Sequence, residues 1–118
     1  MDTHTSFTIQ LIRNTNTKSS DDTITIRQTE FPNMLTICYK DRVSNTQHQV
    51  FVEKSKVSEY CISLFHILSY DTEPFQHIQV NFPAFPCVLL NASDLQYSSL
   101  RERLQHMLWF TLEQSFAV

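Results

Sequence analysis

The stretch "HQVFVEKSKVSEYCISLFHILSY", residues 48–70, contains the change of pattern that decides the fold of this 118-residue chain. Residues 48–53 alternate polar and apolar side chains, which is typical of a strand with one buried face. From Ser55 onward the apolar residues recur every three or four positions, which predicts a helix with one broad apolar stripe. Ser55 is the expected N-cap, and Pro74 predicts that the helix ends near Tyr70. The residues of the stripe are Val57, Tyr60, Cys61, Leu64, Phe65 and Leu68.

Upstream of this stretch, short alternating segments are separated by brief polar links. This arrangement predicts an antiparallel meander that ends with the strand at 48–53. Residues 1–5 and 14–22 are polar, and we expect them to be flexible. The first three strands of this meander are expected at residues 7–12, 23–27 and 34–40.

Downstream, the motif Phe-Pro-Ala-Phe-Pro, residues 82–86, separates two further expected strands. Its prolines cannot donate hydrogen bonds to a strand ladder, so they end one strand at 77–82 and precede the next at 87–90. The continuous apolar run at 87–90 indicates a strand that is buried on both faces. Phe82 and Phe85 could anchor this corner to the core or form an exposed recognition surface, and we favour the core.

The last element is a long expected helix, about residues 94–115. Ser93 and Gln96 have the spacing of a capping box, and Asp94 adds a negative charge to the first turn. Asn91-Ala92-Ser93 matches the pattern for N-glycosylation, but without a secretory signal we interpret it as part of a helix cap. The apolar stripe of this helix comprises Tyr97, Leu100, Leu104, Met107, Leu108 and Thr111.

Together these elements predict a single α+β domain over residues 1–118. Its mainly antiparallel sheet of about six strands packs against two helices in the order ββββ-α-ββ-α. Hydrophobic residues make up 42% of the chain and charged residues 18%, a globular composition. The net charge of −3 gives no overall attraction to nucleic acid or to anionic membranes.

The cellular compartment is expected to be intracellular, either cytoplasmic or nuclear. The first residues lack the basic start and apolar block of a signal peptide, so secretion is not expected, and no apolar run is long enough to span a bilayer. Cys38, Cys61 and Cys87 are odd in number and lie in apolar stretches, which favours reduced, buried thiols over disulfides.

The chain contains no glycine. A Walker loop, a dinucleotide-binding glycine turn and a nucleophile elbow all require glycine, so these three motifs are excluded. The abundance of Asn, Thr, Ile and Phe fits drift in an AT-rich genome, such as that of a virus.

Enzymatic chemistry has little support in the sequence. No two cysteines or histidines have the close spacing of a structural zinc site, so neither a metal nor a cofactor is expected. A small enzyme that uses one cysteine with a histidine is the third hypothesis, because such pairs meet in space rather than in sequence. We expect a protein that is not an enzyme.

The leading hypothesis is a protein-interaction or assembly module that self-associates, as a homodimer, or docks a partner through the C-terminal helix. In the last turns of that helix, large apolar residues extend almost all round its axis. Either this end is buried in the domain's own core, or it forms a partner surface. The residues assigned to that surface are Trp109, Phe110, Leu112 and Phe116, together with Phe85.

The alternative is a single-stranded nucleic-acid-binding protein. Basic residues at the ends of two neighbouring expected strands, with aromatic residues nearby, could hold a phosphate backbone and stack bases. Acidic residues between these basic ones weaken the positive electrostatic potential of the surface. The residues assigned to this surface are Tyr39, Lys40, Arg42, Phe51, Lys54 and Lys56.

Overall fold

A computed structural model describes residues 6–13, 22–41, 46–71 and 78–116. It confirms the predicted α+β fold and the element order ββββ-α-ββ-α. Two short 3-10 turns, η1 and η2, precede the helices. The bounds are β1 Ser6–Arg13, β2 Asp22–Gln28, β3 Met34–Asp41, β4 Thr46–Glu53, η1 Lys54–Lys56, α1 Val57–Asp71, β5 Ile78–Asn81, β6 Val88–Leu90, η2 Ala92–Gln96 and α2 Ser98–Ser115. The segments 1–5 and 14–21, expected to be flexible, lie outside the described residues, whereas Asp22 begins β2.

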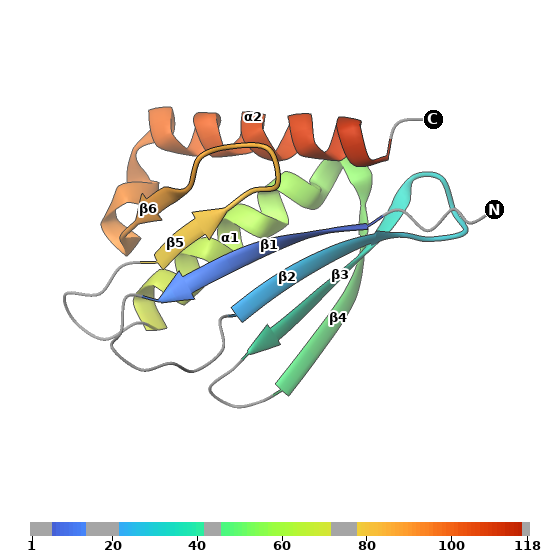
Figure 1. Cartoon of the computed structure of the whole chain (residues 1–118), viewed down its shortest axis with the longest axis horizontal. Helices are drawn as coiled ribbons and strands as arrows, with labels where there is room; N and C mark the ends of the chain where they lie inside the picture. The colour runs from blue at the N-terminus through green and yellow to red at the C-terminus, as the bar shows by residue number, and fades with distance from the viewer. Residues whose placement is uncertain (1–5, 14–21, 42–45, 72–77, 117–118) are drawn as a thin grey trace.

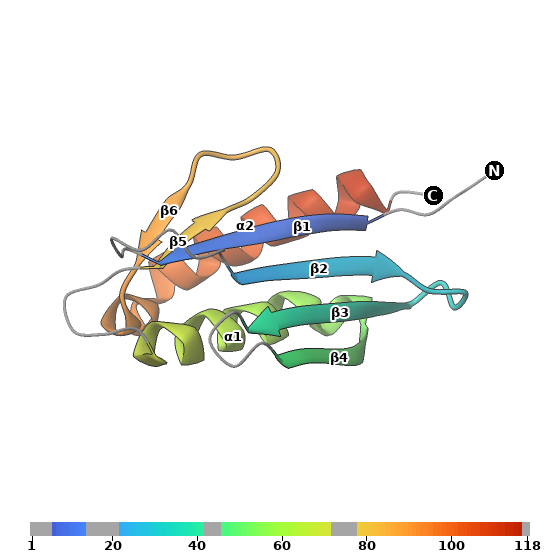
Figure 2. The ribbon, with the colours of Figure 1, turned by 60° about the horizontal axis from the view of Figure 1, so that its bottom comes forward.

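All strand pairs in the sheet are antiparallel, and their order is β4-β3-β2-β1-β5-β6. Both helices cover the same face of the sheet, and the chain therefore forms two layers (Figures 1 and 2). The other face of the sheet carries no helix in the described part of the chain. Among the described residues, no helix is long and apolar enough to cross a membrane.

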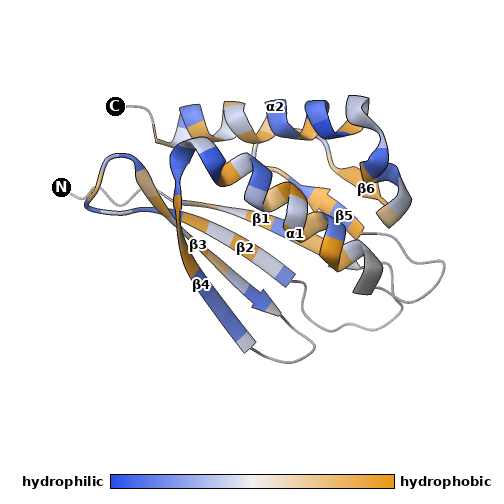
Figure 3. Cartoon of the chain, turned by 180° about the vertical axis from the view of Figure 1, so that it is seen from behind, coloured by the Kyte–Doolittle hydropathy of each residue, from blue (hydrophilic) through white to orange (hydrophobic). Residues whose placement is uncertain are grey.

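Alternation along each strand produces one buried and one open face. Ile9 pairs with Ile24, which pairs with Tyr39, and all three side chains face the helices. Helix α1 contributes Cys61 and Phe65 to the same core. Viewed from the helix side, apolar colour gathers between the two layers (Figure 3). The apolar face of the strands and the apolar stripe of the helix are buried against each other, so both contribute to one core.

The start of the first helix differs from the prediction. Ser55 lies within η1, and α1 begins at Val57, so Ser55 is not the N-cap. The backbone N–H of Lys54 donates to the carbonyl oxygen of Asn33 at 2.8 Å, which ties η1 to the turn before β3. This contact holds the chain in a tight turn before the α-helix starts.

The start of the last helix also differs, because the capping residues are Asn91 and Asp94 rather than Ser93 and Gln96. The backbone N–H of Asn91 donates to a carboxylate oxygen of Asp94 at 2.9 Å, and the N–H of Asp94 donates to the carbonyl oxygen of Asn91 at 3.0 Å. The cap therefore starts the 3-10 turn η2. The backbone of Tyr97 is extended, so α2 starts only at Ser98.

Strand β6 was predicted to be buried on both faces, and this is wrong. Val88 and Leu90 are buried, but Leu89 is 60% exposed. The reason is that both helices lie on the same face of the sheet, so in the described part of the chain no helix covers the other face of β6.

Candidate functional site

The exposed side of α2 carries two of the four aromatic and aliphatic residues assigned to a partner surface. Trp109 is 50% exposed and Phe110 is 40% exposed. Leu112 and Phe116 are buried, so their assignment to an outer surface is wrong. The end of α2 packs against β1, where the rings of Phe116 and Phe7 lie with centroids 5.7 Å apart. Of the two readings left open by the sequence, burial in the core holds for Leu112 and Phe116 and exposure holds for Trp109 and Phe110.

Trp109 lines an open groove of about 410 Å³, which we call the Trp109 groove. The groove lies where the end of β4 and the start of β3 meet the C-terminal half of α2. Lys54 and Glu113 approach to 3.7 Å across this junction and form a partly exposed ion pair. The residues that line the groove are Asn33, Met34, Glu53, Lys54, Ser55, Trp109 and Glu113.

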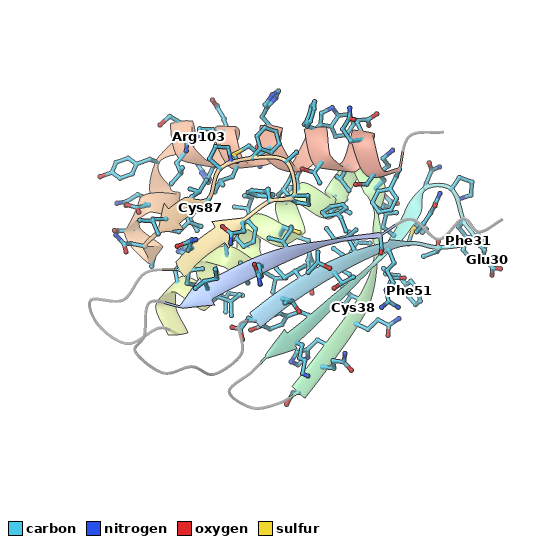
Figure 4. The ribbon with its side chains drawn as sticks, viewed as in Figure 1. Glu30, Phe31, Cys38, Phe51, Cys87 and Arg103 are labelled. Atoms are coloured by element: carbon cyan, nitrogen blue, oxygen red, sulfur yellow. The ribbon has the colours of Figure 1, made fainter. Side chains whose placement is uncertain are left out.

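One wall of the Trp109 groove is held in place by a side chain that the sequence analysis did not single out. The hydroxyl of Thr29 donates to the carbonyl oxygen of Met34 at 2.7 Å and accepts the backbone N–H of Phe31 at 3.0 Å. These bonds fix the β2–β3 turn, from whose tip Glu30 and Phe31 project (Figure 4). Because Met34 and Asn33 belong to this turn and its exit, the groove has a defined wall opposite Trp109.

Phe85 packs into the corner formed by residues 82–86. It is half-buried and packs edge to face against Phe82 of the corner at 6.5 Å and against Phe110 of α2 at 5.4 Å, between ring centroids. Phe82 in turn packs against Phe65 in the core at 6.4 Å. The preferred reading of residues 82–86 as an anchored corner is therefore confirmed, while the assignment of Phe85 to a partner surface stays a prediction.

The residues proposed for nucleic-acid binding do not form one surface. Tyr39 faces the helix layer and stacks on His48 with centroids 5.9 Å apart, whereas Phe51 projects from the opposite face of the sheet. Lys40 pairs across from Gln47 at one end of the β3–β4 ladder, and Lys54 follows the other end. The Lys40–Gln47 pair and the last pair of the ladder, Met34–Glu53, are six residues apart along the strand, roughly 20 Å at the rise of a strand.

Only one of the remaining basic residues of that set lies in the described part of the chain. Lys56 is exposed in η1, next to Lys54, which is engaged by Glu113. Arg42 lies outside the described residues. The prediction placed these side chains near one another because the sequence does not show which face of the sheet each one occupies.

The cysteines were all expected to be buried, and only one is. Burial raises the pKa of the Cys61 thiol to about 12, because the charged thiolate would lose its hydration in the core. A nucleophilic cysteine requires the thiolate, so Cys61 is unsuited to this role. Cys38 is half-buried on the open face of the sheet and Cys87 is exposed before β6. Within the part of the chain that the structure describes, no cluster of three or more His, Cys, Asp or Glu side chains could hold a metal ion.

A feature that the sequence analysis missed is the open face of the sheet. It consists mainly of threonine and glutamine side chains with two cations, Arg27 and Lys40. Thr8 and Thr25, neighbours on β1 and β2, approach to 3.3 Å between their hydroxyl oxygens. The alternation of Thr and Gln with apolar residues was the signal for this face, since polar side chains on a half-buried strand point to solvent.

No protein-family model, no curated protein and no solved structure matches this chain. The surfaces that distinguish the molecule are the Trp109 groove, the open sheet face and the outer edge of β4.

Proposed function

We propose that this chain is a non-enzymatic protein-interaction module that docks a partner protein through the Trp109 groove. The observation that carries the proposal is the half-exposed indole of Trp109 in the wall of a groove formed by three separate segments of the chain. Tryptophan is strongly enriched among the residues that dominate binding energy at protein interfaces. A large apolar ring in a concave, partly charged site is typical of such an anchor.

The magnitude of the available burial supports this role. About half of a tryptophan's roughly 250 Å² of surface is open at Trp109, and covering that area contributes about 3 kcal/mol at roughly 25 cal/mol per Å². This value matches a strong interface anchor, for which truncation to alanine costs at least about 2 kcal/mol. One anchor alone is insufficient, because a stable interface covers about 800 Å² on each partner.

The charges around the groove favour a particular kind of partner. Glu53 and Glu113 give the groove two carboxylates, and Lys54 offsets one of them through its ion pair with Glu113. The remaining negative charge favours a protein segment that presents an apolar side chain next to a basic one. Such a segment would place its apolar group against Trp109 and Met34 and its cation near Glu53.

The experiment is a nuclease-treated pull-down with the wild-type chain, Trp109→Ala and Ile67→Ala, followed by mass spectrometry. Ile67 is 57% exposed on α1 and serves as a matched control for the loss of an exposed apolar side chain. We expect a stoichiometric partner that is retained by Ile67→Ala and lost by Trp109→Ala, while both variants keep the wild-type circular dichroism spectrum.

Two results would contradict the proposal. If the partner binds Trp109→Ala as well as it binds the wild type, the groove is not part of the interface. Cooperative unfolding of the Trp109→Ala domain at room temperature would show that the indole is a structural residue rather than a docking residue. Glu53→Lys gives an independent check, because reversing this charge should weaken a basic partner without removing apolar surface.

A further inference from the structure

Strand β4 forms one end of the sheet, and its outer edge has unusually little protection. Its eight residues pair with β3 in one continuous register, without a bulge. Exposed edge strands in natural proteins normally carry lysine, proline or a bulge, or are very short, because their backbone groups otherwise pair with another chain. From Thr46 to Val52 the strand contains no lysine, arginine, proline, aspartate or glutamate. Among the described residues, no further strand pairs with this edge.

The opposite end of the sheet is different. Strand β6 has only three residues, Val88–Leu90, and Pro86 precedes it closely. A short edge next to a proline offers few backbone groups for pairing. The asymmetry singles out β4 as the edge that is open to association.

We propose that β4 pairs antiparallel with β4 of a second copy of this chain, so that two six-stranded sheets join edge to edge around a two-fold axis. A two-fold axis perpendicular to the sheet keeps the helix layers of both copies on the same side and makes the interface self-complementary. It also requires that residues facing each other across the axis lie on the same face of the sheet. This surface is separate from the Trp109 groove, although Glu53 at the end of β4 lines that groove.

The side chains of β4 select one register. With Phe51 on the axis, Phe51 faces Phe51 of the second copy, and Val50 faces Val52, so apolar side chains meet across the whole centre. Glu53 then faces Gln49, and no like charges oppose each other. With Val50 on the axis, Phe51 would face Gln49 and Val52 would face His48, which places apolar beside polar side chains at both positions. Cross-strand aromatic and β-branched pairs favour the first register.

The area available sets the expected strength. Phe51 is 66% exposed, so two rings of roughly 200 Å² each bring about 260 Å² of apolar surface to the centre of the contact. The pairing of one strand with another stays well below the roughly 1,600 Å² of a standard interface. We therefore expect a reversible dimer with a dissociation constant on the order of micromolar, typical of small and transient interfaces.

The first test is sedimentation equilibrium of the wild-type chain from about 1 to 200 μM, a range chosen to bracket micromolar dissociation. The average molar mass is expected to rise with protein concentration from 13.9 kDa toward twice that value. In the proposed register Phe51→Lys places two lysines opposite each other, and we expect at least a tenfold weaker dimer. Leu89→Lys, on the exposed face of β6, is the matched control and should dimerise like the wild type. Trp109→Ala should also dimerise, which separates a failure of this proposal from a failure of the Trp109 groove.

The second test reads the register and holds even if a lysine variant fails to fold. In a Cys38→Ser, Cys87→Ser background, Phe51→Cys should form a disulfide between two chains under mild oxidation, because facing Cα atoms lie within disulfide range. Val50→Cys should not, because its own copy lies two residues away across the ladder, beyond about 7 Å. A wild-type chain that stays monomeric at 200 μM, or Phe51→Lys with unchanged dimerisation, overturns the proposal. A disulfide at Val50 in place of Phe51 overturns the register.

Discussion

Phe110 and Phe85 pack edge to face, with ring centroids 5.4 Å apart and ring planes at 74°. This contact is the outer end of a line of aromatic rings that continues through Phe82 to Phe65 in the core. It attaches the corner between β5 and β6 to α2, and Figure 1 shows this corner passing across the helix. Phe110 therefore has a structural role, although 40% of it is exposed.

Replacing either ring of this pair should lower the stability of the fold. Phe110→Ala is expected to reduce the free energy of unfolding by about 1–2 kcal/mol, less than the 3–5 kcal/mol of a fully buried phenylalanine, because the ring is already partly hydrated. Urea unfolding of Phe85→Ala, Phe110→Ala and the double variant should give a coupling energy of about 0.5–1.5 kcal/mol, as for aromatic pairs. If the two single substitutions change the free energy of unfolding additively, the two rings do not stabilise each other. Ile67→Ala serves as the surface control, with a change within about 0.5 kcal/mol.

The cap of η2 predicts that substitutions at two adjacent residues, Asp94 and Ser93, affect stability differently. Asp94→Ala removes the carboxylate that accepts the backbone N–H of Asn91, so we expect a loss of about 1 kcal/mol and a melting temperature lower by about 4 °C. Ser93→Ala should change the melting temperature little, because Ser93 is exposed and takes no part in that cap. Thermal unfolding followed by circular dichroism measures both. A larger effect at Ser93 than at Asp94 would restore the capping box expected from the sequence.

The order of the elements could be predicted because each period in the sequence reflects burial on one face. Ile24 and Ile26 alternate with threonines, and Cys61, Phe65 and Leu68 recur at helical spacing, so both patterns point to the core without further information. The cap at η2 could not be resolved in the same way. Asn91 with Asp94 and Ser93 with Gln96 have the same spacing, and only the structure shows that Asn91 has the extended backbone of an N-cap while Ser93 lies inside the 3-10 turn.

The candidate site was less accessible to sequence reasoning. Leu112 and Phe116 lie at the margin of the apolar stripe of α2, and the approach of Phe116 to Phe7 depends on tertiary packing that the helical period does not contain. The Trp109 groove brings together the β2–β3 turn, η1 and α2, which are far apart in the chain. The position of β4 at the end of the sheet likewise depends on strand order, which follows from the route of α1 back to β5.

The buried thiol of Cys61 makes stability depend on pH in the alkaline range. Its pKa is about 12 in the folded chain, against an ordinary value of 9.0, because the core does not solvate the thiolate. Above pH 9 the unfolded chain loses this proton while the folded chain keeps it, so unfolding becomes more favourable as pH rises. The stability contribution is fully present below pH 9 and is lost progressively toward pH 12. At pH 10.5 the loss amounts to about 2 kcal/mol.

The measurement compares urea unfolding of the wild type and Cys61→Ala at pH 8 and pH 10.5. The variant lacks only this thiol, so the alkaline titration of tyrosines, lysines and the other two cysteines is common to both chains. We expect the wild type to lose about 2 kcal/mol more than Cys61→Ala between the two pH values. In native alkylation at pH 8.5, Cys87 should react, whereas Cys61 should react only after unfolding, because the buried thiol is protonated and inaccessible. Parallel pH profiles, or alkylation of Cys61 in the folded chain, would show that this thiol is solvated and would reopen the hypothesis of a cysteine-dependent enzyme.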